Sequence, residues 1–115
     1  MPDLRRGEIW YVDWSPGRGS EQTGLRPSLV VQSDAPNTNE RYQNTIVVTI
    51  SEHGRDIPSH VVIEAGADNE LAYDSYAKCE QVMTISKERL VRRVGKASPD
   101  EMVRVDRALR RMLTL

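Results

Sequence analysis

The chain has 115 residues, the size of one typical domain, and we expect residues 1–115 to form a single domain. Its net charge of −1 at pH 7 disfavours a protein that holds nucleic acid through a large positive excess, so a polyanion site must be local. The single cysteine, Cys79, excludes an internal disulfide and favours a buried thiol in a reducing compartment.

The N-terminal sequence MPDLRRGEIW lacks the apolar segment of a secretory signal. No window approaches the ~18 uninterrupted apolar residues of a membrane span. We therefore expect a cytoplasmic protein that does not associate with a membrane.

Short strand-like runs fill the first four fifths of the chain. In Glu8–Trp14, the side chains of Trp10, Val12 and Trp14 share one face, the period-two pattern of a half-buried strand. The run TIVVTIS at Thr45–Ser51 is β-branched and almost continuously apolar, which favours a central strand covered on both faces. Further strands are predicted at Pro27–Gln32, His60–Glu64 and Asp74–Met83, with polar loops at 34–44 and 52–59.

The pattern changes after Thr84. The segment SKERL predicts one short helical turn, and VRRVG predicts a brief strand. Ser98–Leu115 reads as a helix, because Ser98 is an N-cap, Pro99 suits the first turn and Glu101 completes a capping box. Its apolar stripe is expected to pack on the sheet: Met102, Val105, Leu109, Met112 and Leu113. Together, these predicted strands and the helix indicate a mainly β fold, a bent antiparallel sheet or small barrel with a C-terminal helix.

The charge is uneven along the chain. From Ser86 to Leu115 there are nine Lys or Arg residues against four Asp or Glu residues, about +5, which leaves about −6 elsewhere. These cations form either a basic edge or a solvated helix face that suits the helix dipole. The candidates are Arg92, Arg93, Lys96, Arg107, Arg110 and Arg111.

Metal chemistry has poor support in the sequence. The only histidines, His53 and His60, lack the spacing of a zinc site, and no clustered acidic motif indicates magnesium. The glycine-rich SPGRGSEQTG lacks the G-K-[ST] ending of a phosphate-binding loop. We expect no metal and no cofactor.

Two residues stand where a strand meets a loop. Arg26 precedes the strand at Pro27, and its planar guanidinium suits a phosphodiester, although an ion pair with Glu21 or Asp34 is the alternative. Ser51 ends the central strand at the rim of the sheet, where its hydroxyl either serves a site or caps the following turn.

The sequence resembles the MazF/PemK family of toxin endoribonucleases. The similarity begins in RRGEIWYVDWSPGRGSEQTGLRPSLVVQSD, with the specific string G-S-E-Q-x-G-x-R-P, and continues through NTIVVTIS, PSHVVIE and DSYAKCEQVMTISKERL into the C-terminal helix. The resemblance implies an SH3-like antiparallel barrel of the CcdB/PemK kind and a homodimer. It also implies metal-independent, sequence-specific cleavage of single-stranded RNA, and a cognate antitoxin whose acidic C-terminal segment occupies the RNA groove.

The resemblance also implies roles for particular residues. Arg26 corresponds to the family's catalytic arginine, and Ser51 stands where many relatives have a threonine, with Thr49 as the alternative if the register is off by two. Gln81 matches a family glutamine that lies near the RNA, and Glu21, which matches the glutamate of G-S-E-Q, either orients Arg26 or contacts a base. The expected RNA-binding or orienting residues are Ser20, Glu21, Gln22, Thr49 and Gln81.

Cleavage without a metal would use the RNA 2′-hydroxyl as nucleophile and give 2′,3′-cyclic phosphate and 5′-hydroxyl ends. Arg26 and Ser51 would bind the phosphate, whereas surface or structural roles are favoured for His53 and His60. Trp14 and Tyr42 are further possible base readers, although Trp14 suits the core. The rival functions are a CcdB-like toxin that poisons gyrase on the same fold and a non-catalytic nucleic-acid-binding module.

Overall fold

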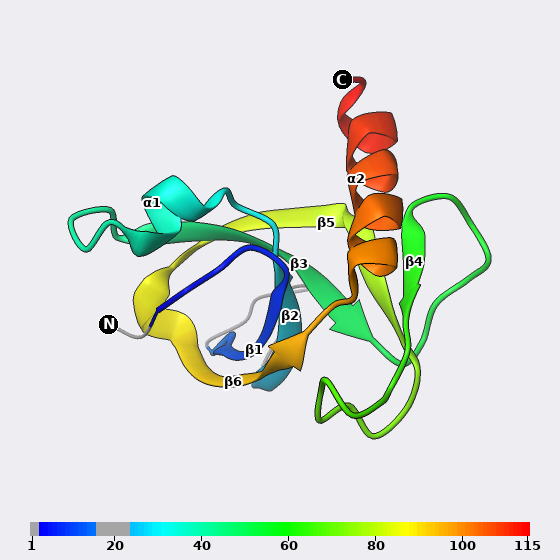
Figure 1. Cartoon of the computed structure of the whole chain (residues 1–115), viewed down its shortest axis with the longest axis horizontal. Helices are drawn as coiled ribbons and strands as arrows, with labels where there is room; N and C mark the ends of the chain where they lie inside the picture. The colour runs from blue at the N-terminus through cyan, green and yellow to red at the C-terminus, as the bar shows by residue number, and fades with distance from the viewer. Residues whose placement is uncertain (1–2, 16–23) are drawn as a thin grey trace.

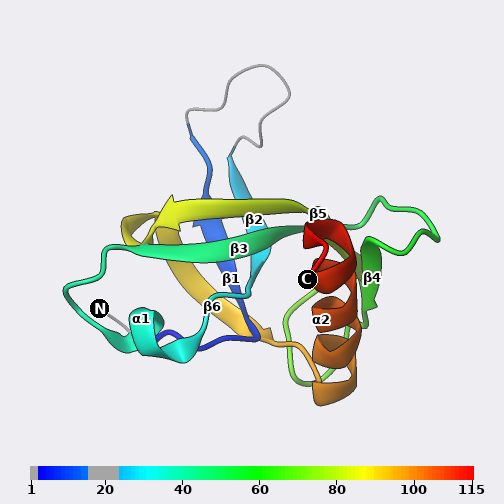
Figure 2. The ribbon, with the colours of Figure 1, turned by 90° about the horizontal axis from the view of Figure 1, so that it is seen from above.

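The structure of the protein is a computed structural model that describes residues 3–15 and 24–115. Its fold is built on one six-stranded antiparallel sheet (Figures 1 and 2). The spatial order of its strands is β4-β5-β3-β2-β1-β6. They are β1 (Glu8–Asp13), β2 (Leu25–Val30), β3 (Asn44–Ser51), β4 (His60–Ile63), β5 (Ser75–Ser86) and β6 (Leu90–Lys96). The helices are α1 (Asp34–Thr38), the 3-10 turn η1 (Lys87–Arg89) and α2 (Pro99–Leu113). This architecture confirms the predicted mainly β fold with a C-terminal helix.

The sheet curls until its two edges approach each other. Asn69, in the connection between β4 and β5, forms an isolated antiparallel bridge with Gly95 of β6. Beside it, the backbone amide of Lys96 donates a 3.1 Å hydrogen bond to the carbonyl of Asp68. A Cβ on Gly95 would lie 2.2 Å from that carbonyl oxygen, so the close approach requires glycine. The connection gives the sheet its barrel-like closure.

Buried side chains form two clusters on the sheet. One gathers Trp10, Val12 and Trp14 as the alternation predicted, and Trp14 is a core residue. The other lies between the sheet and α2 and includes the buried Cys79. Strand β3 lies between β2 and β5 and is largely buried, which confirms the predicted central strand.

Helix α2 begins with the predicted capping box. The Ser98 hydroxyl accepts a 3.1 Å hydrogen bond from the Glu101 amide, and the Glu101 carboxylate accepts one of 2.8 Å from the Ser98 amide. Val105 is fully buried, but Met112 and Leu113 are 44 % and 54 % exposed because the last turns extend beyond the sheet (Figure 1). The prediction that the whole stripe packs on the sheet is therefore wrong at its end. Among the described residues, no helix is long and apolar enough to cross a membrane.

The segment 34–44, predicted to be a loop, contains the short helix α1. The Asn37 side chain is buried and bonds to Gln32 and Thr45. The buried Lys87 ammonium donates to the carbonyls of Pro36, Asn37 and Asn39 at 2.8 to 3.1 Å, which satisfies the end of the helix. These partners are distant in sequence, so local composition does not show them.

Two strand boundaries also differ from the prediction. Strand β2 begins at Leu25 rather than Pro27, because Arg26 and Pro27 pair with Val12 and Tyr11 of β1. Pairing with β3 begins only at Ser28, so the proline lies where one side of β2 is still an edge. Strand β5 continues to Ser86, opposite Asn44 at the start of β3.

Candidate functional site

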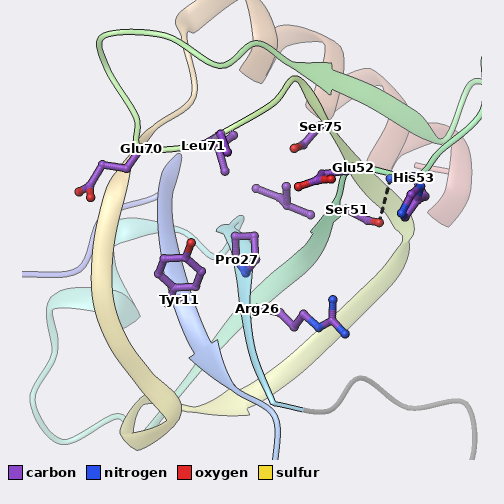
Figure 3. A pocket seen from close by; sticks show the side chains of 11 residues that line it. Tyr11, Arg26, Pro27, Ser51, Glu52, His53, Glu70, Leu71 and Ser75 are labelled. Carbon is purple, nitrogen blue, oxygen red and sulfur yellow. Dashed lines mark hydrogen bonds between the residues drawn. The ribbon is translucent and has the colours of Figure 1, made fainter.

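A pocket of about 440 Å³ opens where β2 and β3 meet the loops that follow β3 and β4 (Figure 3). Arg26 of β2 and Ser51 at the end of β3 both line it. The structure therefore brings together the two predicted catalytic residues, which stand twenty-five positions apart in the sequence. The other lining residues are Tyr11, Pro27, Ile50, Glu52, His53, Glu70, Leu71, Ala72 and Ser75.

Strand pairing fixes the backbone beneath Arg26. Arg26 pairs with Val12 of β1 in an antiparallel register. Two positions later, at Ser28, β2 also begins to pair with β3. The arginine is exposed, and its side chain projects from β2 onto the pocket (Figure 3). A planar guanidinium held this way can donate two parallel hydrogen bonds to a phosphate.

The Ser51 hydroxyl also caps the turn after β3. It accepts a 3.1 Å hydrogen bond from the backbone amide of His53, which is the local role that the sequence offered as the alternative. A hydroxyl that accepts one bond still carries a hydrogen to donate. Capping and phosphate binding are therefore compatible at this residue.

Thr49 and Gln81 do not line this pocket. Thr49 is buried, and its hydroxyl donates a 2.6 Å hydrogen bond to the side-chain oxygen of Gln81 on β5. This bond leaves the amide NH₂ of Gln81 with its two donors. The remaining predicted RNA-contacting residues, Ser20, Glu21 and Gln22, lie outside the described residues.

His60 holds the loop 52–59 that forms one wall of the pocket. Its Nδ1 accepts a 3.0 Å hydrogen bond from the Arg55 amide, and its Nε2 lies 2.8 Å from a carboxylate oxygen of Glu80. Because Nδ1 accepts a hydrogen bond, the hydrogen that points to Glu80 is on Nε2. Gly54 packs against the ring of Tyr76, where a Cβ would lie 2.3 Å from Cγ. These contacts give His60 the structural role that the sequence favoured.

Burial raises the pKa of the Glu80 carboxyl, but several interactions together hold it below its ordinary value of 4.5. They are the hydrogen bonds from His60 and from its own backbone amide, and the charges of His60 and Lys78. The ionised carboxylate therefore favours the geometry that positions His60.

His53 lines the pocket, although the sequence favoured a surface or structural role for it. It is exposed and lines the pocket with Arg26, Ser51 and Glu52 (Figure 3). The sequence feature that could have indicated a place in the pocket is its position two residues after Ser51, on the loop that follows the central strand. An imidazole there adds a possible general acid or base to the pocket.

The pocket is mixed in charge rather than uniformly basic. Glu70 accepts two hydrogen bonds from Arg92, at 2.9 and 3.0 Å, and the same guanidinium lies 5.4 Å from the centre of the Tyr11 ring. Glu52 contributes a second carboxylate. Within residues 3–15 and 24–115, His, Cys, Asp and Glu form no group of three that could hold a metal ion.

The basic residues of the C-terminal quarter do not form one edge. Arg92 and Arg93 of β6 pair with Glu70 and Glu8. The arginines of α2 line two different grooves, with Arg104, Arg107 and Arg111 on one and Arg110 on the other. Of the two alternatives that the sequence left open, a single basic edge is therefore not formed by these described residues.

The curled sheet, the C-terminal helix and a pocket lined by an arginine and a hydroxyl define a small barrel-like domain with a candidate phosphodiester-binding site. The family described as PemK-like, MazF-like toxin of type II toxin-antitoxin system matches residues 5–113. The chain belongs to this family, as its sequence resemblance predicted.

Curated relatives and solved structures agree with this assignment. Endoribonuclease MazF9 of Mycobacterium tuberculosis is 38% identical over 97% of this chain and 98% of its own length. Endoribonuclease MazF of Staphylococcus epidermidis is 38% identical over 92% of this chain and 88% of its own. A crystal structure of MazF from Deinococcus radiodurans covers 100% of both chains with a TM-score of 0.82 at 19% identity, a likeness of fold.

Proposed function

We propose that this chain is a toxin endoribonuclease that cleaves single-stranded RNA in a sequence-specific, metal-independent manner. The proposal rests chiefly on the observation that Arg26 and Ser51 line the same pocket. Two relatives that are 38% identical over nearly the whole chain are named endoribonucleases, which supports the same activity here.

In the proposed reaction, the RNA 2′-oxygen attacks the adjacent phosphorus and the bond from phosphorus to the 5′-oxygen breaks. The products are a 2′,3′-cyclic phosphate and a 5′-hydroxyl. Arg26 binds the non-bridging oxygens and stabilises the charge that grows on them. The Ser51 hydroxyl donates a hydrogen bond to the same phosphate and still accepts the hydrogen bond from the His53 amide.

The reaction moves two protons, one from the 2′-hydroxyl and one to the leaving 5′-oxygen. A guanidinium keeps its protons in proteins, so Arg26 is poorly suited to this work. His53 lines the same pocket, and imidazole is the side chain that exchanges protons near neutral pH. We assign His53 to proton transfer, with Glu52 beside it as a second group in the pocket.

The other predicted RNA contacts remain part of the proposal. Ser20, Glu21 and Gln22 come from the G-S-E-Q string that precedes Arg26. Gln81 presents amide donors to a base, since Thr49 occupies its side-chain oxygen. Thr49 thereby orients Gln81 rather than touching RNA itself.

The test uses purified chain, free of antitoxin, with a long single-stranded RNA in EDTA. Discrete cuts are expected from the wild type, loss of the cuts from Arg26→Ala, and full activity from Arg41→Ala, an exposed arginine outside the pocket. A pH–rate profile that loses one inflection in His53→Ala supports proton transfer by that residue. Intact RNA from a folded wild-type sample would overturn the proposal and favour a binding or protein-targeting role.

We propose two protein partners, a second copy of the chain and a cognate antitoxin with an acidic C-terminal segment, in the cytoplasm. The solved structures similar to this chain include an endoribonuclease in complex with its cognate antitoxin, with a TM-score of 0.78 at 23% identity. Leu113, at the end of α2, lines one groove together with Val82 of β5. An apolar surface of this kind favours contact with a second copy of the chain. Leu113→Asp is expected to lower the mass measured by light scattering from dimer to monomer, and an unchanged mass would contradict this surface.

A further inference from the structure

The pocket that contains Arg26 and Ser51 is larger than a phosphate group requires. Its volume of about 440 Å³ lies within the range of sites that bind a whole small molecule. Apart from these two residues, much of its lining is apolar or aromatic: Tyr11, Pro27, Ile50, Leu71 and Ala72. RNA bases are bound between aromatic and apolar side chains of this kind. A base attached to the cleaved phosphate can therefore enter the rest of the pocket.

Glu52 brings a carboxylate into this part of the pocket. It directly follows Ser51, the last residue of β3, and its side chain points into the pocket (Figure 3). In the part of the chain that the structure describes, the Glu52 carboxylate forms no hydrogen bond and no ion pair. Both of its oxygens are therefore open to donors on a ligand.

The second carboxylate of the pocket is already occupied. Glu70 accepts two hydrogen bonds from Arg92, at 2.9 and 3.0 Å, and its side chain points away from Glu52 (Figure 3). The Ser75 hydroxyl donates a 2.9 Å hydrogen bond to the carbonyl of Tyr73, so its oxygen remains as an acceptor. Glu52 and Ser75 therefore both favour a ligand that donates hydrogen bonds.

A carboxylate with two open oxygens distinguishes among the four RNA bases. Guanine carries N1–H and its N2 amino group side by side, so it can donate two parallel hydrogen bonds to the two oxygens. Adenine and cytosine have an acceptor ring nitrogen beside the amino group, and uracil has a single N–H between two carbonyl groups. Each of these three bases would place a lone pair against a carboxylate oxygen, so guanine is the base that pairs with both.

We propose that Glu52 selects guanine at the nucleotide beside the cleaved phosphate and is thus a specificity-determining residue. Ser51 and Glu52 are consecutive, and consecutive side chains at the end of a strand point in different directions. Ser51 can therefore bind the phosphate while Glu52 binds the base of the same nucleotide. The inference rests on the proposed function, because single-stranded RNA is the molecule that enters the pocket.

The first test measures binding without cleavage. The probes are trinucleotides with a uracil on each side of a central guanine, adenine, cytosine, uracil or hypoxanthine, and each 2′-hydroxyl is replaced by hydrogen. Hypoxanthine keeps N1–H but lacks the N2 amino group, so it loses one of the two hydrogen bonds to the carboxylate. NMR titration of the full chain gives each Kd. Glu52→Gln tests the carboxylate, and Glu40→Gln is the matched control, at an exposed glutamate outside the pocket.

The guanine probe is expected to bind the wild type and Glu40→Gln about tenfold or more tightly than each other probe. Glu52→Gln should lose this preference, because an amide presents one acceptor and one donor group in place of two acceptors. Equal affinity of the wild type for the guanine and hypoxanthine probes would overturn the inference. A guanine preference that survives in Glu52→Gln would also overturn it.

Cut sites mapped on a long RNA separate this inference from the proposed function. The expected result is a guanine at one fixed position beside the wild-type cuts, and mixed bases at that position in the cuts made by Glu52→Gln. Discrete wild-type cuts that share no guanine would overturn the role of Glu52 and leave the endoribonuclease activity in place. Intact RNA, together with a guanine preference in binding that depends on Glu52, would support guanine recognition and overturn only the proposed cleavage.

Discussion

The hydroxyl of Ser51 accepts a 3.1 Å hydrogen bond from the backbone amide of His53, and both residues line the pocket that contains Arg26. One short turn therefore presents a hydroxyl and an imidazole beside a guanidinium. The same hydrogen bond makes Ser51 a capping residue, so an effect on folding has to be separated from an effect on cleavage.

We predict that Ser51→Ala lowers the cleavage rate by about a hundredfold, because one donor to the transition-state phosphate is lost. Ser51→Thr keeps the hydroxyl and should retain most of the activity. Ser86→Ala is the matched control, since the Ser86 hydroxyl accepts a similar 3.3 Å bond from the Glu88 amide at the start of η1. Single-turnover rates and melting temperatures of all three variants test this. An equal rate loss in Ser86→Ala would contradict a specific role for Ser51.

Features encoded by neighbouring residues could be predicted from the sequence. The capping box of Ser98 and Glu101 spans three positions, and the shared face of Trp10, Val12 and Trp14 follows from simple alternation. The expectation that Arg26 and Ser51 serve one site came instead from the family resemblance, because residues on different strands that line one pocket leave no local signal in the sequence.

Features that rest on distant partners were missed for the same reason. Helix α1 is held by Lys87, about fifty positions later, and the loop that carries His53 is held by His60 and Glu80. The end of the α2 stripe was misjudged because periodicity shows that a face is apolar without showing how far the sheet extends beneath it.

Lys87 should be among the most important polar residues for stability. Its ammonium is buried and donates to three backbone carbonyls at 2.8 to 3.1 Å. We predict that Lys87→Met destabilises the fold by about 2–4 kcal/mol, because those carbonyls lose their donors. Chemical denaturation measures the change, with Lys96→Met, at an exposed lysine, as a control expected within about 0.5 kcal/mol of wild type.

Glu80 should make the stability of the fold depend on acid. The pKa of its carboxyl is lowered in the folded state, so its contribution is present above the unfolded value near 4.5 and is lost as the pH falls through the folded value. The difference in melting temperature between wild type and Glu80→Gln should therefore narrow from about pH 6 to about pH 3. A difference that stays constant over this interval would show that the charge of Glu80 contributes nothing.

Cys79 should be unreactive in the folded protein. Burial, together with the charge of Glu80, raises the pKa of its thiol to about 11, so about one molecule in a thousand carries the thiolate at pH 8. We predict that iodoacetamide labels the native chain far more slowly than the chain in denaturant. Labelling at the same rate in both conditions would show that the thiol is accessible.

We propose that Arg26 and Ser51 serve a cleavage in which the 2′-hydroxyl of the RNA attacks its own backbone. The most direct measurement uses a short single-stranded RNA containing a mapped cut site, in EDTA, with one substrate carrying a 2′-deoxy nucleotide on the 5′ side of the cut. We predict cyclic-phosphate and 5′-hydroxyl ends from the unmodified RNA and no cleavage of the deoxy substrate. Cleavage of the deoxy substrate at that position, or products with 5′-phosphate ends, would contradict it.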